Sequence, residues 1–170
     1  MGAWGFDLYD SDYTLDVVGN LCDFFKIDYD NLDLSELNEK GFPLQKQEKI
    51  NFIDNFGRFL KREFKLQKID LKKLSFELNK SEDKTDLALL WVIINDILSY
   101  NQLLVPNLLV ENGIKSVEYL IENQAQTYRN PEARKKSLIK YQTRFENHLI
   151  AMALYQEKNK QVNKSVNFKI

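Results

Sequence analysis

Apolar residues recur at three- and four-residue spacing through most of this chain, and this period restricts its fold more than any other feature. Between residues 45 and 65, for example, they are Ile50, Ile53, Phe56, Leu60 and Phe64. This spacing places apolar side chains on one side of an α-helix. Gly and Pro number only six and three in 170 residues, too few for the turns of a β-sandwich or barrel. The sequence therefore predicts an all-α fold.

The same period divides the chain into about six helices. We expect five of them near residues 12–26, 45–65, 70–79, 85–104 and 131–157, with one helical turn near 33–37 and irregular chain from 106 to 113. Val117, Leu120 and Ile121 mark one more helix of about three turns. No repeat or Gly/Ser-rich linker interrupts them, and 170 residues are typical of one domain. The prediction is a single-domain helical bundle over residues 1–158, opened by an N-terminal docking arm (1–11) and followed by a polar tail (159–170).

The segment 85–104 is the most hydrophobic part of the chain. Its apolar face is so wide that this helix is expected at the centre of the bundle, beginning at Ser81 or Asp83. The last helix is expected to begin with Asn130 as cap and Pro131 in the first turn. Its basic residues are expected to project away from its apolar stripe; they are Arg134, Lys135, Lys136, Lys140 and Arg144.

Charge is distributed in blocks although the net charge is only −1. The first 40 residues carry ten Asp and Glu but two Lys, residues 41–80 are basic, 81–127 acidic, and 128–170 carry ten basic and three acidic residues. These blocks either attract one another inside the fold or leave a charged face for a partner. An acidic pI and an acidic first block disfavour nucleic-acid binding.

Chemistry-bearing residues are sparse. Asp7, Asp10, Asp12 and Asp16 make an oxygen-rich cluster, but the Gly and distal Glu of an EF-hand loop are missing, so helix capping is favoured over a metal site. His148 and Cys22 are each the only residue of their type, which rules out a His pair and an internal disulfide. We therefore predict no enzyme, no cofactor and no metal site.

No charged and apolar leader opens the chain, and the longest apolar run, 87–94, is far shorter than a membrane span. We expect a cytoplasmic protein that is not embedded in a membrane.

The opening Met-Gly-Ala-Trp-Gly-Phe-Asp-Leu-Tyr-Asp-Ser-Asp, with Asp16 four residues later, resembles an uncharacterised bacterial family of small proteins that begin with a GxWG motif and an Asp-containing stretch. The resemblance covers about the first 18 residues and implies an all-helical bacterial cytoplasmic protein without a known activity or cofactor. We expect Gly2 and Gly5 to permit a tight arm, Trp4 to plug the bundle and Asp12 to tie the arm to the first helix.

The leading functional hypothesis is a non-enzymatic protein-binding factor, of the immunity or inhibitor type, that occupies a basic toxin or nuclease. Tyrosines suit protein interfaces and acidic residues speed association with a basic partner. The candidate partner-binding residues are Tyr9, Asp10, Tyr13, Asp28, Tyr29, Asp30 and Asp33. One alternative is a metal-binding protein or metal-dependent enzyme that uses the N-terminal Asp cluster. The other is a structural homodimer that buries the apolar helix 85–104.

Overall fold

The structure is a computed structural model, and the residues it describes are 83–167 together with eight earlier positions. Those eight are Asp7, Leu8, Thr14, Val17, Gly19, Asp54, Gly57 and Arg58. Three α-helices dominate this part: α5 (Lys84–Tyr100), α6 (Asn107–Tyr119) and α7 (Pro131–Asn167). Among the described residues no strand occurs, so this part of the chain is helical as predicted.

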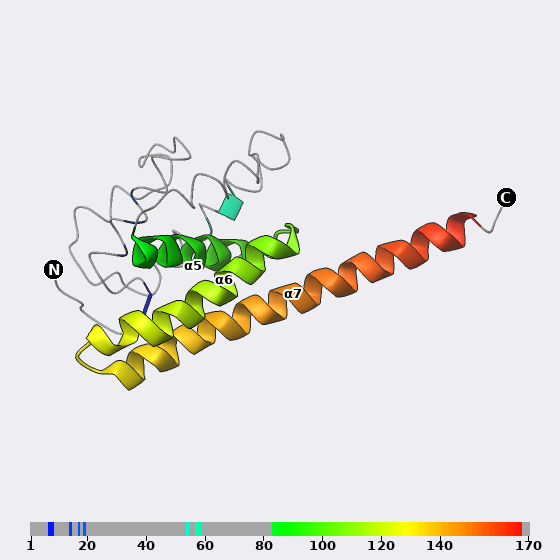
Figure 1. The fold of residues 1–170 in the computed structure, drawn as a ribbon. Coiled ribbons are helices and arrows are strands. Elements are labelled where there is room, and N and C mark those ends of the chain that lie inside the picture. Colours follow the sequence, from blue (N-terminus) through cyan, green and yellow to red (C-terminus); the bar gives the residue numbers. More distant parts are fainter. Residues whose placement is uncertain are drawn as a thin grey trace.

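Helix α5 is the centre of the described core. Asp83 caps its first turn by accepting hydrogen bonds from the backbone N–H groups of Thr85 and Asp86, as one of the two predicted caps. Every residue from 91 to 99 is buried, which confirms the central position expected from the wide apolar face. Helix α6 packs against both α5 and α7, and α5 also contacts α7 (Figure 1).

The end of α5 differs from the sequence prediction, which extended this helix to residue 104. The helix ends at Tyr100 in a Schellman motif: the N–H of Leu103 bonds to Leu98 O, and that of Gln102 to Ser99 O. Gln102 has a φ of 51° at the position where Gly is usual. Because no Gly marks this stop, the sequence pattern did not reveal it.

Helix α6 occupies the segment predicted to be irregular, so the prediction for 106–113 is wrong. Pro106 precedes the first turn, where the missing N–H costs nothing, and Gly113 lies inside the helix. A Cβ at Gly113 would lie 2.5 Å from Cγ of Asn95. Gly113 is therefore a point of close approach between α6 and α5 and does not break the helix.

Two short segments connect α6 to α7. Leu120–Gln124 is a π-helical turn, and Ala125–Thr127 is a 3₁₀ turn. Asn130 then caps α7 by accepting a hydrogen bond from the N–H of Ala133, as predicted. The resulting hairpin places α6 and α7 side by side in opposite directions (Figure 1).

Helix α7 runs to Asn167, ten residues beyond the end expected near Glu157. Its C-terminal part projects past the ends of α5 and α6 (Figure 1). The side chains from Ala153 to Asn159 are all exposed. Among the described side chains of α7, Met152 is the last that is buried, so the helix continues well beyond its buried face.

The described residues before 83 meet this core at separate points. Leu8 and Val17 are buried in the same apolar cluster as α5, α6 and α7. Gly57 is helical, and a Cβ there would lie 1.8 Å from Nδ2 of Asn101, so Gly57 lies directly against the end of α5. The six-helix bundle and the docking arm involve residues beyond those described and stay predictions.

Candidate functional site

Arg134 is completely buried, at 0% exposure, although it was expected to project away from the apolar stripe of the last helix. Its Nη1 donates to the backbone oxygen of Asp7 at 2.7 Å, and its Nη2 donates to Oε1 of Gln124 at 3.1 Å. The guanidinium also lies over the ring of Tyr128, 4.5 Å from the centroid. A buried cation is tolerated only with such partners, and these come from two other segments of the chain.

The π-helical turn explains how Gln124 reaches Arg134. Its widened hydrogen bonding joins the N–H of Ala125 to Leu120 O, five residues back. This register differs from that of an α-helix and changes the direction in which residues after 120 project. No sequence signal marks a π-turn, and the contact it supports was not predicted.

Asp7 joins the N-terminal region to α7 with its side chain as well as its backbone. One carboxylate oxygen accepts from the Tyr141 hydroxyl at 2.5 Å, from the Leu8 N–H at 2.6 Å and from the Ser137 hydroxyl at 3.5 Å. Asp7 belongs to the predicted Asp cluster, where capping of the first helix was the favoured role. Here it contacts the last helix.

Tyr141 connects this contact to helix α5. Burial, followed by the charges of Asp96 and Asp7, raises the pKa of Tyr141 well above its usual value. Tyr141 is therefore a neutral donor to Asp7. The Arg144 guanidinium lies 5.4 Å from the Tyr141 ring centroid and pairs with Asp96, whose side chain is almost fully buried on α5.

These groups form a polar network that joins Asp7 to α5 and α7. Each carboxylate in it has a donor, so the network has the properties of a structural tie. In the part of the chain that the structure describes, no three His, Cys, Asp or Glu residues group to hold a metal ion.

His148 lies outside the network and is also buried, with 6% exposure. Its Nε2 is 2.9 Å from Leu103 O, which can only accept, so Nε2 carries the proton. Burial lowers the pKa of His148, and the bond to Leu103 opposes that shift.

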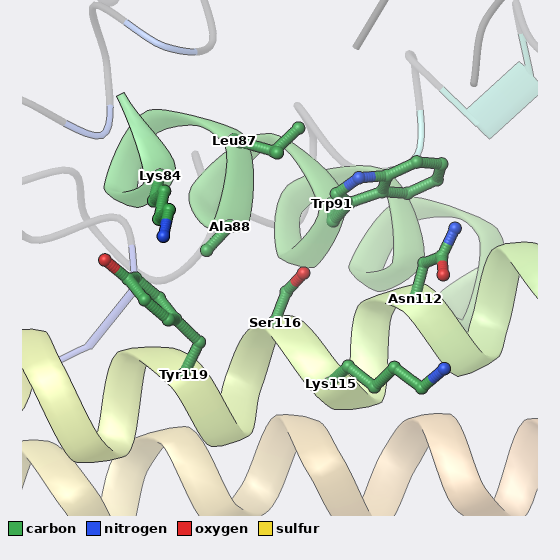
Figure 2. Close-up of a pocket in the computed structure, with 8 residues that line it drawn as sticks. All are labelled: Lys84, Leu87, Ala88, Trp91, Asn112, Lys115, Ser116 and Tyr119. Carbon is green, nitrogen blue, oxygen red and sulfur yellow. The ribbon is translucent and has the colours of Figure 1, made fainter. Parts of the chain in front are cut away.

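An open groove of 380 Å³ lies between α5 and α6 (Figure 2). Its apolar lining comes from Leu87, Ala88 and Trp91 on α5 and from the ring of Tyr119 on α6. Its polar lining comes from Lys84 on α5 and from Asn112, Lys115 and Ser116 on α6. None of the described lining residues is acidic.

The outer face of α7 carries aligned apolar side chains. Ile139, Ile150 and Leu154 are 50%, 59% and 54% exposed, and at 3.6 residues per turn they fall within one third of the helix circumference. They lie opposite the buried face that holds Leu138 and Phe145. We call Ile139, Ile150 and Leu154 the α7 stripe. Exposed Lys136 and Lys140 lie beside it.

The sequence-predicted site residues are not placed by this structure. The proposed partner-binding set (Tyr9, Asp10, Tyr13, Asp28, Tyr29, Asp30 and Asp33) and the motif residues Gly2, Trp4, Gly5 and Asp12 lie outside the described residues. Neither the groove nor the α7 stripe was predicted. The sequence gives a weak indication that Ile150 and Leu154 are exposed, because they fall outside the apolar face predicted for the last helix, to which Leu149 and Met152 belong.

The apolar residues of α5 from 91 to 98 are buried within one chain. The alternative of a structural homodimer stays a prediction. Within the described residues, no helix is long and apolar enough to cross a membrane.

A comparison of the chain with protein-family models, curated proteins and solved structures finds no match in any of the three. The resemblance to the GxWG family accordingly remains an expectation from the sequence.

Proposed function

We propose that this chain is a non-enzymatic protein-binding factor of the immunity or inhibitor type, and that it contacts its partner through the α7 stripe. The observation that carries the proposal is the exposure of Ile139, Ile150 and Leu154 along one face of a helix whose end projects from the body. Single exposed apolar residues are common, but three on one helix face make a docking surface for an apolar partner.

The size of the α7 stripe suits a protein partner. Fifteen residues separate Ile139 from Leu154, which at 1.5 Å per residue is about 22 Å of helix. A small molecule would cover only part of that length. A groove or helix surface on another protein can cover all of it, with large apolar side chains as anchors.

The charged residues of this chain suggest that the surface of the partner carries both acidic and basic groups. Lys136 and Lys140 favour an acidic rim opposite α7. The acidic residues Asp28, Asp30 and Asp33 keep their proposed role of steering a basic region of the same partner. A basic toxin or nuclease with an apolar docking surface fits this proposal.

The test compares tagged full-length chains in extracts of the native cell. We expect wild type to capture one protein in 1:1 ratio, and Ile150→Ser/Leu154→Ser to lose it. The matched control is Leu104→Ser/Leu108→Ser, which alters two equally exposed leucines outside α7. Circular dichroism should show that all three chains are equally helical.

Capture that is equal for the stripe variant and the control would overturn this docking surface. Sedimentation of the purified chain gives a second, independent outcome. A dimer that the stripe variant converts to a monomer would show that a second copy covers the stripe, and would replace the partner protein with self-association.

A further inference from the structure

The groove between α5 and α6 has the properties of a small-molecule site. Ala88 and Ser116 lie at its middle, and their small side chains leave space between the two helices (Figure 2). One turn from Ser116, α6 makes its close approach to α5 at Gly113. The hollow of 380 Å³ lies at the lower end of the range for ligand pockets, so it suits a compact ligand.

The polar side chains of the groove are mostly donors. Ammonium groups come from Lys84 and Lys115, hydroxyls from Ser116 and Tyr119, and an indole N–H from Trp91. No hydrogen bond or ion pair joins any of these side chains to a described residue. A lining rich in donors and without an acidic side chain suits an anionic ligand.

The two ends of the groove differ. Lys84 and Tyr119 lie together at one end, and Trp91 lies toward the other, where Asn112 and Lys115 also lie (Figure 2). An anion at the first end would meet an ammonium and a hydroxyl. An apolar group on the same molecule would then extend over Ala88 toward the Trp91 ring.

We propose that this groove binds a small aromatic molecule that carries one anionic group. The anionic group, a carboxylate or a phosphate, lies at Lys84 and Tyr119, and the ring lies between Ala88 and Trp91. This inference does not depend on the protein-binding proposal, because the groove involves α5 and α6, and the docking stripe lies on α7.

The test follows the indole N–H signals of the full chain by NMR during titration with phenylacetate or phenyl phosphate. The chain has two Trp residues, and Trp91→Phe identifies the Trp91 signal by its loss. We expect saturable movement of that signal below about 10 mM ligand, the weak affinity typical of a small fragment. The relative affinities of the two probes identify the anionic group.

Variants locate the site. Lys84→Gln should weaken phenylacetate binding about fivefold by removing a charge-assisted contact at an exposed position. Lys136→Gln, on α7 away from the groove, should leave it unchanged. Ser116→Leu should fill the groove and abolish binding. If Ser116→Leu does not fold, Lys84→Gln still tests the site, because Lys84 is exposed and its replacement should not affect folding.

Three results would overturn the proposal: no saturable shift with either anion, equal binding of neutral phenylacetamide, or equal weakening by Lys84→Gln and Lys136→Gln. Equal binding of the amide would show that the groove does not recognise the anionic group.

Discussion

A buried guanidinium needs acceptors for its N–H groups, and Arg134 donates from Nη1 to Asp7 O and from Nη2 to Gln124 Oε1. These contacts join residues 127 and 10 positions apart in the chain. A basic residue among lysines on a helix is ordinarily solvated, so local sequence favoured exposure. The burial of Arg134 depends on a segment that local sequence does not bring near it.

Replacing Arg134 with Ala should lower the free energy of unfolding by about 2 to 4 kcal/mol, because it leaves buried acceptors without their donors. Lys136→Ala, at an exposed position of the same helix, should change it by less than about 0.5 kcal/mol. Urea unfolding followed by circular dichroism measures both. Similar losses for the two variants would show that the buried contacts of Arg134 add nothing to stability.

His148 predicts a pH dependence of stability. Burial holds its folded-state pKa below the ordinary 6.5, so below that pH the unfolded chain takes up a proton that the folded chain resists. This component of stability is complete above pH 6.5 and is lost as the pH falls from there toward the folded-state pKa.

The control for His148 is His148→Gln, which retains a donor for Leu103 O and cannot titrate. Urea midpoints measured between about pH 7.5 and 5.5 should fall more steeply for wild type than for this variant. Parallel pH profiles of the two chains would contradict the assignment.

Among elements, the contact between α5 and α6 depends on Gly113. Asn95 Nδ2 donates to Trp91 O at 2.8 Å and to Leu109 O at 3.0 Å, which holds its amide against α6. A Cβ at position 113 would lie 2.8 Å from Asn95 Cβ, so rotation of the amide alone cannot relieve the overlap. The helices would have to separate.

Gly113→Ala should therefore destabilise the fold by about 1 to 3 kcal/mol, although Gly→Ala in an exposed helix interior stabilises by up to about 1 kcal/mol. Asn95→Ala in the same chain should recover part of the loss, and a double-mutant cycle of urea unfolding measures that coupling. Additive losses would show that Gly113 and Asn95 are energetically independent.

The elements also show what local pattern predicts. The width of the apolar face identified α5 as central, and Asp83 and Asn130 were among the caps expected. The stop after Tyr100 was missed because Gln102 occupies the left-handed position, and α6 was missed in part because a packing glycine resembled a helix breaker. Residue type reveals the need for a cap, but it does not distinguish a glycine that ends a helix from one that lets two helices touch.

At the scale of the molecule, the charge blocks do interact within the fold. Asp96, from the acidic block 81–127, pairs with Arg144 from the basic block that follows it. Lys136 and Lys140 remain exposed on α7, so the attraction between blocks does not use all of the basic charge. Composition alone could not decide between blocks that pair inside the fold and blocks that leave a charged face, because the outcome depends on which face of α7 meets α5.

The sites were less predictable than the fold, since the groove and the α7 stripe exist only after the helices pack.

The tie between Asp7 and α7 also sets an order of events during synthesis. A ribosome that adds about 5 to 20 residues per second needs about 6 to 25 s to proceed from Asp7 to Arg134. During that time Leu8, which ends fully buried, has no α7 to pack against. The hydrogen bonds between Asp7 and α7 therefore form late in translation, and a nascent chain that stalls before Pro131 cannot make them.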